Sequence, residues 1–179
     1  GPVKSADFRA FDRWSDALMA SNYNLTEYFS LIGTPEKLYT GSMAGVALLK
    51  ELAGPAWPTA WFVSNLVILL VIVALLVLLC RQLKLGTPIT AVVTALLLLS
   101  ADYLTWPRYL LTDTLLSLFV LLTIVIAAMP IRLGWLMLQA VVVVSMAFTR
   151  PAALPYLAAF VAFYGLWALS TLTQKPLNR

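Results

Sequence analysis

Histidine is absent from the 179 residues of this chain, and cysteine occurs once, at Cys80. The lack of histidine excludes a His/Cys metal site, and a single cysteine excludes a disulfide within the chain. Charge is also scarce, since 11% of the residues are charged against about a quarter in an average soluble domain. The composition is not that of an ordinary soluble enzyme, and we interpret Cys80 as a passive apolar residue near a helix end.

The few acidic residues are unevenly distributed. Six of the eight stand before residue 57, and only Asp102 and Asp113 follow it. A charge at the centre of a bilayer costs about 2.5–3.5 kcal/mol on insertion scales, so a long stretch this poor in charge predicts a lipid-embedded region. The net charge of +4 does not predict a nucleic-acid partner, because the basic residues stand singly at the ends of apolar runs.

Five apolar runs follow one another after residue 56. A membrane-spanning helix needs roughly 20 residues, and backbone in lipid must satisfy its own hydrogen bonds. The runs therefore predict an all-α polytopic membrane protein with about five transmembrane helices. These runs occupy residues 57–79, 88–104, 110–129, 133–149 and 152–172.

Basic residues predict the orientation of these spans. The positive-inside rule assigns the basic residues that follow the first, third and fifth runs to the cytoplasm. Arg108 and Arg150 then lie on the other side of the membrane, against the rule. Residues 1–56 become an extracytoplasmic juxtamembrane segment, residues 57–173 a transmembrane bundle and residues 174–179 a cytoplasmic tail. The cytoplasmic set is Arg81, Lys84, Arg132, Lys175 and Arg179.

The amino-terminal segment is amphipathic. Apolar residues recur at helical spacing over residues 8–19, and a second short helix is predicted over residues 39–52. Both are too polar to span a bilayer, and we expect them to lie at its interface. The aromatic residues expected in a headgroup belt are Trp14, Tyr23, Tyr28, Phe29, Tyr39, Trp57 and Trp61.

Two groups of charged residues in this segment are candidates for chemistry. Asp7 stands four residues before Phe11, among further charges that include Asp12 and Asp16; a solvated helix face explains the same pattern. Glu36 and Lys37 precede the second helix, where an ammonium suits a lipid phosphate. Ordinary snorkelling of the lysine is the alternative.

A third candidate group surrounds Asp113, which opens an apolar helix. Acids at a membrane boundary are rare and often functional, although Thr112 or Asp113 as a simple helix cap is the alternative. Arg108 and Arg150 are cations expected on the same outer face.

Three motifs in this order resemble a family. The run SADFRAFDRWSDALMAS (residues 5–21), PEKLYTG (35–41) and RYLLTDTLLSLF (108–119) resemble conserved loops of polyprenyl-phosphate-sugar-dependent GT-C glycosyltransferases. These are the lipid A aminoarabinose transferases and the protein O-mannosyltransferases. The family begins with a further transmembrane helix and contains many more, so we expect missing helices or a partner subunit.

The resemblance implies roles for particular residues. Asp7 matches the family's general base and Asp113 its second-loop acid, so both are predicted to be catalytic. Glu36 and Lys37 match residues near the donor phosphate, and we add Arg108 and Arg150 as further substrate-binding cations. An acceptor must lose a proton as it attacks, and the leaving phosphate gains charge, so a carboxylate and fixed cations suit the reaction.

The predicted function is sugar transfer from a polyprenyl-phosphate donor to an acceptor at the outer face. The expected setting is a multi-pass protein of the bacterial inner membrane, with membrane lipid as a further partner. No cofactor is predicted, since Asp7 and Asp113 alone are weak grounds for a divalent metal. A non-catalytic polyprenyl-lipid binding or transport subunit, and a purely structural bundle, are the rivals. A transferase requires Asp7, Lys37 and Asp113 around one outward cavity.

Overall fold

The computed structural model describes residues 6–34, 36–100, 112–130, 132–150 and 153–173. Within these ranges every regular element is helical, as the sequence predicts. The longer helices are α1 (Ala6–Ala20), α3 (Thr40–Ala53), α4 (Trp57–Gln82), α5 (Thr87–Leu99), α7 (Asp113–Ala127), α8 (Leu133–Ala147) and α9 (Leu154–Thr173). The short ones are α2 (Leu25–Leu31) and the 3₁₀ turns η1 (Glu36–Tyr39) and η2 (Gly54–Ala56).

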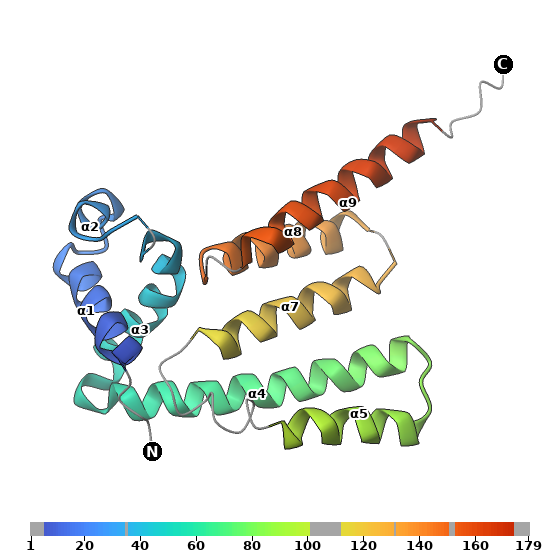
Figure 1. Cartoon of the computed structure of the whole chain (residues 1–179), viewed down its shortest axis with the longest axis horizontal. Helices are drawn as coiled ribbons and strands as arrows, with labels where there is room; N and C mark the ends of the chain where they lie inside the picture. Colours follow the sequence, from blue (N-terminus) through green and yellow to red (C-terminus); the bar gives the residue numbers. More distant parts are fainter. Residues whose placement is uncertain (1–5, 35, 101–111, 131, 151–152, 174–179) are drawn as a thin grey trace.

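The helices form two bodies, which are arranged end to end (Figure 1). The first, here called the cap, consists of α1, α2, η1 and α3. The second, the bundle, contains the remaining longer helices, which pack in the order α5, α4, α7, α8, α9. The cap sits at the amino-terminal end of α4. Helices α7 and α9 begin at the same end of the bundle, so the cap also lies near their starts.

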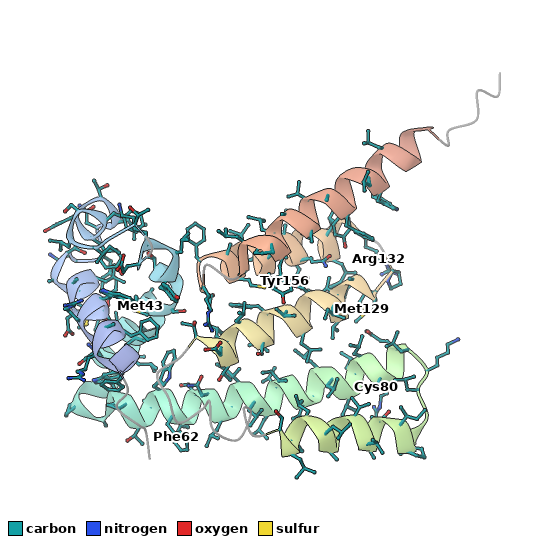
Figure 2. All side chains as sticks on the ribbon, in the orientation of Figure 1. Met43, Phe62, Cys80, Met129, Arg132 and Tyr156 are labelled. Atoms are coloured by element: carbon teal, nitrogen blue, oxygen red, sulfur yellow. The ribbon has the colours of Figure 1, made fainter. Side chains whose placement is uncertain are left out.

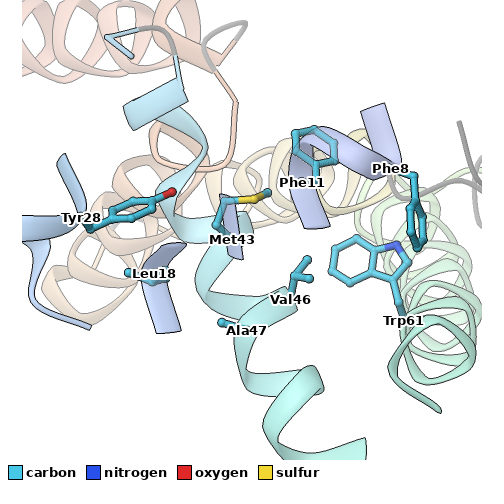
Figure 3. Close-up of a cluster of buried hydrophobic side chains, with 8 residues drawn as sticks. All are labelled: Phe8, Phe11, Leu18, Tyr28, Met43, Val46, Ala47 and Trp61. Carbon is cyan, nitrogen blue, oxygen red and sulfur yellow. The ribbon is translucent and has the colours of Figure 1, made fainter. Parts of the chain in front are cut away.

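The cap is held together by an aromatic core. The helical spacing of Phe8, Phe11 and Leu18 places them on one face of α1, where all three are buried. Phe8 stacks on Trp57 with 5.2 Å between ring centroids. Figure 3 shows the buried side chains of this cluster, which are Phe8, Phe11, Leu18, Tyr28, Met43, Val46, Ala47 and Trp61.

This core corrects the expectation of an aromatic headgroup belt. Trp61 and Tyr28 are buried in the cluster, and Trp14, Tyr39 and Trp57 pack against it. The reason is that α1 turns its apolar face onto α3 and α4, where the rings find protein partners.

A lysine also fastens α1 to α3. The side chain of Lys50 is only 9% exposed, and its Nζ lies 2.5 Å from the Asp12 carboxylate and 2.6 Å from that of Asp16. It also lies 5.0 Å from the centre of the Trp57 ring. The side chains of Asp12 and Asp16 are solvent-exposed, as the solvated-face interpretation predicts, but both also pair with a lysine thirty-odd residues away.

The bundle exposes large apolar side chains on its outside and buries a few polar ones beside its apolar core. Leu70 on α4 and Leu166 on α9 are 69% and 68% exposed, whereas Asn65 on α4 and Gln139 on α8 are buried. Side chains on the outer helices project away from the bundle along its length (Figure 2). Gln139 donates to the Thr123 carbonyl and accepts from Tyr164, so its amide is satisfied between helices. Cys80 is buried and free, as expected.

Among the described residues, one continuous helical stretch, Glu36–Gln82, is long and apolar enough to cross a membrane. The other apolar helices are shorter: Thr87–Leu99, Asp113–Ala127, Leu133–Ala147 and, in its apolar part, Leu154–Trp167. A helix of 15 residues, such as α7, rises only about 23 Å, less than the ~30 Å of hydrocarbon core.

Candidate functional site

An ion pair between Asp113 and Arg150 is the centre of the candidate site. Asp113 is the first residue of α7, and Arg150 follows the turn after α8. Arg150 Nη1 donates to Asp113 Oδ1, and the two side chains are 33% and 23% exposed. Thr112, the residue before α7, makes no side-chain capping hydrogen bond, so the simple threonine cap is not formed. The Asp113 carboxylate instead joins two segments that lie 37 residues apart.

The cap closes this pair into a small pocket. Three rings of the cap, Phe11, Trp14 and Tyr39, line the pocket together with Asp113 and Arg150. The ring centroids are 5.5–6.0 Å apart, so the rings form one continuous aromatic wall. The cavity holds about 120 Å³, roughly the volume of four waters, whereas pockets for drug-sized ligands hold ~300–1,000 Å³. It can take one small group at a time, held between rings and charges.

Two hydrogen bonds fasten the cap at this point. The Gly41 N–H donates to the Phe148 carbonyl at 3.0 Å, and Ser42 Oγ donates to the Thr149 carbonyl at 3.1 Å. A Cβ at Gly41 would lie 3.0 Å from the Phe148 oxygen, so the close approach favours glycine here. This junction positions the residues that lead directly into Arg150.

Asp7 stands in the first turn of α1. It precedes Phe11 by four residues and Trp14 by seven, so its backbone shares their helical register. The pocket-lining face of α1 thus continues toward Asp7. Arg108, the other predicted cation of this region, lies outside the described residues.

Glu36 and Lys37 are not part of the pocket. Both belong to η1, and only their neighbour Tyr39 reaches the pocket wall. Lys37 Nζ lies 5.7 Å from the centre of the Phe29 ring, a cation–π contact inside the cap. Glu36 lies beside the buried Tyr28, where burial and the Glu36 carboxylate raise the pKa of the Tyr28 phenol. The expected convergence of Lys37 with Asp113 is therefore wrong in this structure, because Lys37 contacts an aromatic ring of the cap instead.

An apolar groove of about 320 Å³ begins one turn below Asp113. It runs down α7 from Leu116 to Ile124 and is closed by α4, α5 and α9. Tyr156, labelled in Figure 2, contributes a polar edge on α9. The groove thus lies mainly between α4 and α7.

The sequence interpretation missed Trp14 and Tyr39 as site residues. Trp14 carried a signal, since it stands seven residues after Asp7 at the same register as Phe11. Tyr39 follows directly on the Glu36–Lys37 motif. In the ranges that the structure describes, no group of three His, Cys, Asp or Glu side chains could hold a metal ion.

Comparison with known proteins adds no relative to this picture: no family model, no curated protein and no solved structure matches the chain.

Proposed function

We propose that this chain is a module of a multi-pass membrane glycosyltransferase that takes its sugar from a polyprenyl-phosphate donor at the extracytoplasmic face. The observation that carries the proposal is the pocket between cap and bundle. It joins Asp113, Arg150 and the face of α1 that leads to Asp7, and it lies at the mouth of an apolar groove.

The surface of the bundle supports a membrane setting. Large apolar side chains are exposed on every bundle helix, including Leu70, Leu96, Met137 and Leu166. A soluble monomer seldom exposes such continuous apolar surface, and buried polar residues such as Asn65 suit a bundle surrounded by lipid. Helices α5, α7 and α8 are short for a full crossing, so in this proposal their flanking residues complete the spans.

The chemistry assigns a separate task to each charge. Asp7 accepts the proton of the acceptor hydroxyl or amine as its oxygen or nitrogen bonds to the anomeric carbon. The bond from that carbon to the phosphate oxygen breaks, and the guanidinium of Arg150 stabilises the phosphate that leaves. Asp113 holds Arg150 in place until the donor arrives. The groove along α7 receives the first isoprene units of the carrier.

One observation favours the non-catalytic alternative, a polyprenyl-lipid binding subunit. Asp113 is the one acid among the described residues that line the pocket, and it is already the ion-pair partner of Arg150. A binding subunit uses Arg150 and the groove in the same way and has no need of Asp7.

Donor turnover separates the two functions. We expect the chain in lipid nanodiscs to release polyprenyl phosphate from a polyprenyl-phosphate sugar, with Asp7→Asn reducing the rate by about 10²–10⁴ while donor binding persists. Arg150→Gln should weaken donor binding itself. The matched control is Asp16→Asn, which removes an acid of the same helix outside the pocket and should keep most of the rate. Saturable donor binding without release would replace the transferase by the binding subunit.

A further inference from the structure

A second polar cavity lies at the far end of the bundle from the cap. It holds about 470 Å³ between α4 and α5 and is lined by Arg81, three threonines and apolar residues. Arg81 stands 24 residues after Trp57 on α4, so it lies about 36 Å along this helix from the end that carries the cap. Its polar lining residues Arg81 and Thr87 belong to the end of α4 and the start of α5, where the two helices meet (Figure 1).

The polar groups of the cavity are arranged along one face. Thr87, Thr90 and Thr94 recur at helical spacing on α5 and share the cavity lining with Arg81. Thr90 Oγ1 donates to the Gly86 carbonyl, which leaves its lone pairs open, and Thr94 Oγ1 is buried with no hydrogen-bond partner. The Thr90 hydroxyl is therefore already used as a donor. The donors left on this wall for an oxyanion are the Arg81 guanidinium and the hydroxyls of Thr87 and Thr94.

The charged residues beside this cavity are both basic. Arg81 and Lys84 are the only charged residues between Glu51 and Asp102 in the sequence. Neither belongs to an ion pair among the residues that the structure describes. A guanidinium at a membrane boundary takes a phosphate as its natural partner. The remaining lining residues, among them Val77, Ala91 and Leu98, are apolar and continue along both helices.

We propose that this cavity is a binding site for an anionic phospholipid, with the phosphate on Arg81 and the hydroxyls of Thr87 and Thr94, and one acyl chain between α4 and α5. The inference rests on the membrane setting of the proposed function. Free phosphate would satisfy the donors but leave the apolar length of the cavity unfilled. An amphipathic ligand matches both parts. The positive-inside rule puts this end at the cytoplasmic leaflet, whose surface is anionic.

Lipid binding by the purified chain tests the site. Native mass spectrometry in detergent measures retention of phosphatidylglycerol against phosphatidylcholine with the same acyl chains. We expect a preference for the anionic lipid of about tenfold (~1.4 kcal/mol), because both lipids carry the phosphate but only phosphatidylcholine adds an ammonium that Arg81 repels. Arg81→Gln should abolish this preference, and Ala91→Phe, which fills the cavity from the exposed side of α5, should lower retention of both lipids.

The matched control is Lys84→Gln, since Lys84 carries the same charge one turn away but does not line the cavity. If Arg81→Gln and Lys84→Gln lose the preference for the anionic lipid equally, the attraction is diffuse and the site is overturned. Unchanged lipid retention in Ala91→Phe would also overturn it. Competition by glycerol phosphate, a headgroup without chains, would assign the site to a free phosphate instead. The assay contains no sugar donor, so its failure leaves the transferase proposal to its own test.

Discussion

The cap and the bundle of this chain both bury an apolar core, but they differ in what they expose. In the cap, Phe8 and Met43 are inside while Asp16 reaches the surface, as in a protein that folds in water. In the bundle, Leu70 and Leu166 point outward while Asn65 and Gln139 lie inside. The proposed function explains this difference, because in it the cap faces water and the outside of the bundle faces lipid.

Matched arginine substitutions on the two surfaces should give the largest effect. Leu70→Arg places a charge in the middle of α4 and should cost about 2.5–3.5 kcal/mol of insertion free energy if that surface faces lipid. Leu31→Arg, on the cap, changes a leucine that is similarly exposed and should stay within about 0.5 kcal/mol. Membrane-insertion efficiency and thermal unfolding in nanodiscs measure both. Equal effects of the two substitutions would remove the distinction between the bodies.

Lys50→Met tests what holds the cap together as a separate body. The substitution keeps the length of the side chain but removes its two ion pairs and its hydrogen bond to the Asp12 carbonyl. Charged hydrogen bonds contribute about 1.5–3 kcal/mol, so amide exchange in α1 and α3 should speed up while the bundle is unchanged. Asp16→Asn removes only an exposed partner and should cost less than about 1 kcal/mol. If amide exchange also became faster throughout the bundle, the two bodies would unfold as one unit.

The smallest effect on stability is expected from Tyr28→Phe, and its pH dependence should appear only in the cap and at alkaline pH. The pKa of Tyr28 is raised by burial and by the Glu36 carboxylate, so its neutral form is favoured in the folded state. This contribution is complete below the ordinary tyrosine pKa of about 10 and is lost as the pH rises through the raised value. Tyr28→Phe should leave stability at neutral pH unchanged or raise it by less than about 1 kcal/mol, because it removes a buried hydroxyl that makes no hydrogen bond.

Unfolding curves of the wild type and of Tyr28→Phe as a function of alkaline pH measure this pH dependence of stability, which should appear only above about pH 10. Tyr23→Phe is the comparison, since a hydrogen bond to Glu51 raises the pKa of that exposed tyrosine. Superimposable curves for the wild type and Tyr28→Phe would show that Tyr28 does not titrate in the folded cap.

Helix positions followed well from the sequence because their ends carry strong local signals. Basic residues and prolines bracket the apolar runs, and the structure begins α4 at Trp57 and α8 at Leu133, where the runs begin. The short helix α2 was missed, since seven mixed residues show no period. Its signal was Asn24, whose side chain caps the helix by accepting from the Thr26 and Glu27 amides.

The candidate site was less predictable because it depends on long-range partners. Topology placed Asp113 and Arg150 on one side of the membrane but could not pair them, since the pairing depends on where the turn after α8 lies. Lys37 was expected beside the donor, yet the ring of Phe29 lies within its reach. Which of two nearby partners a flexible lysine takes is decided by tertiary packing, and the local sequence does not contain that information.

The hydrogen bonds of Gly41 and Ser42 hold the cap on the bundle. Binding of a molecule in the pocket is therefore thermodynamically linked to docking of the cap. The pocket has walls from both bodies, so any molecule that fills it binds only the docked form and stabilises that form by RT ln(1 + [L]/Kd). Reciprocity then requires that a cap held more firmly on the Phe148 and Thr149 carbonyls binds the same molecule more tightly. Affinity at Arg150 can therefore be raised or lowered from the other side of the junction, by residues that never touch the ligand.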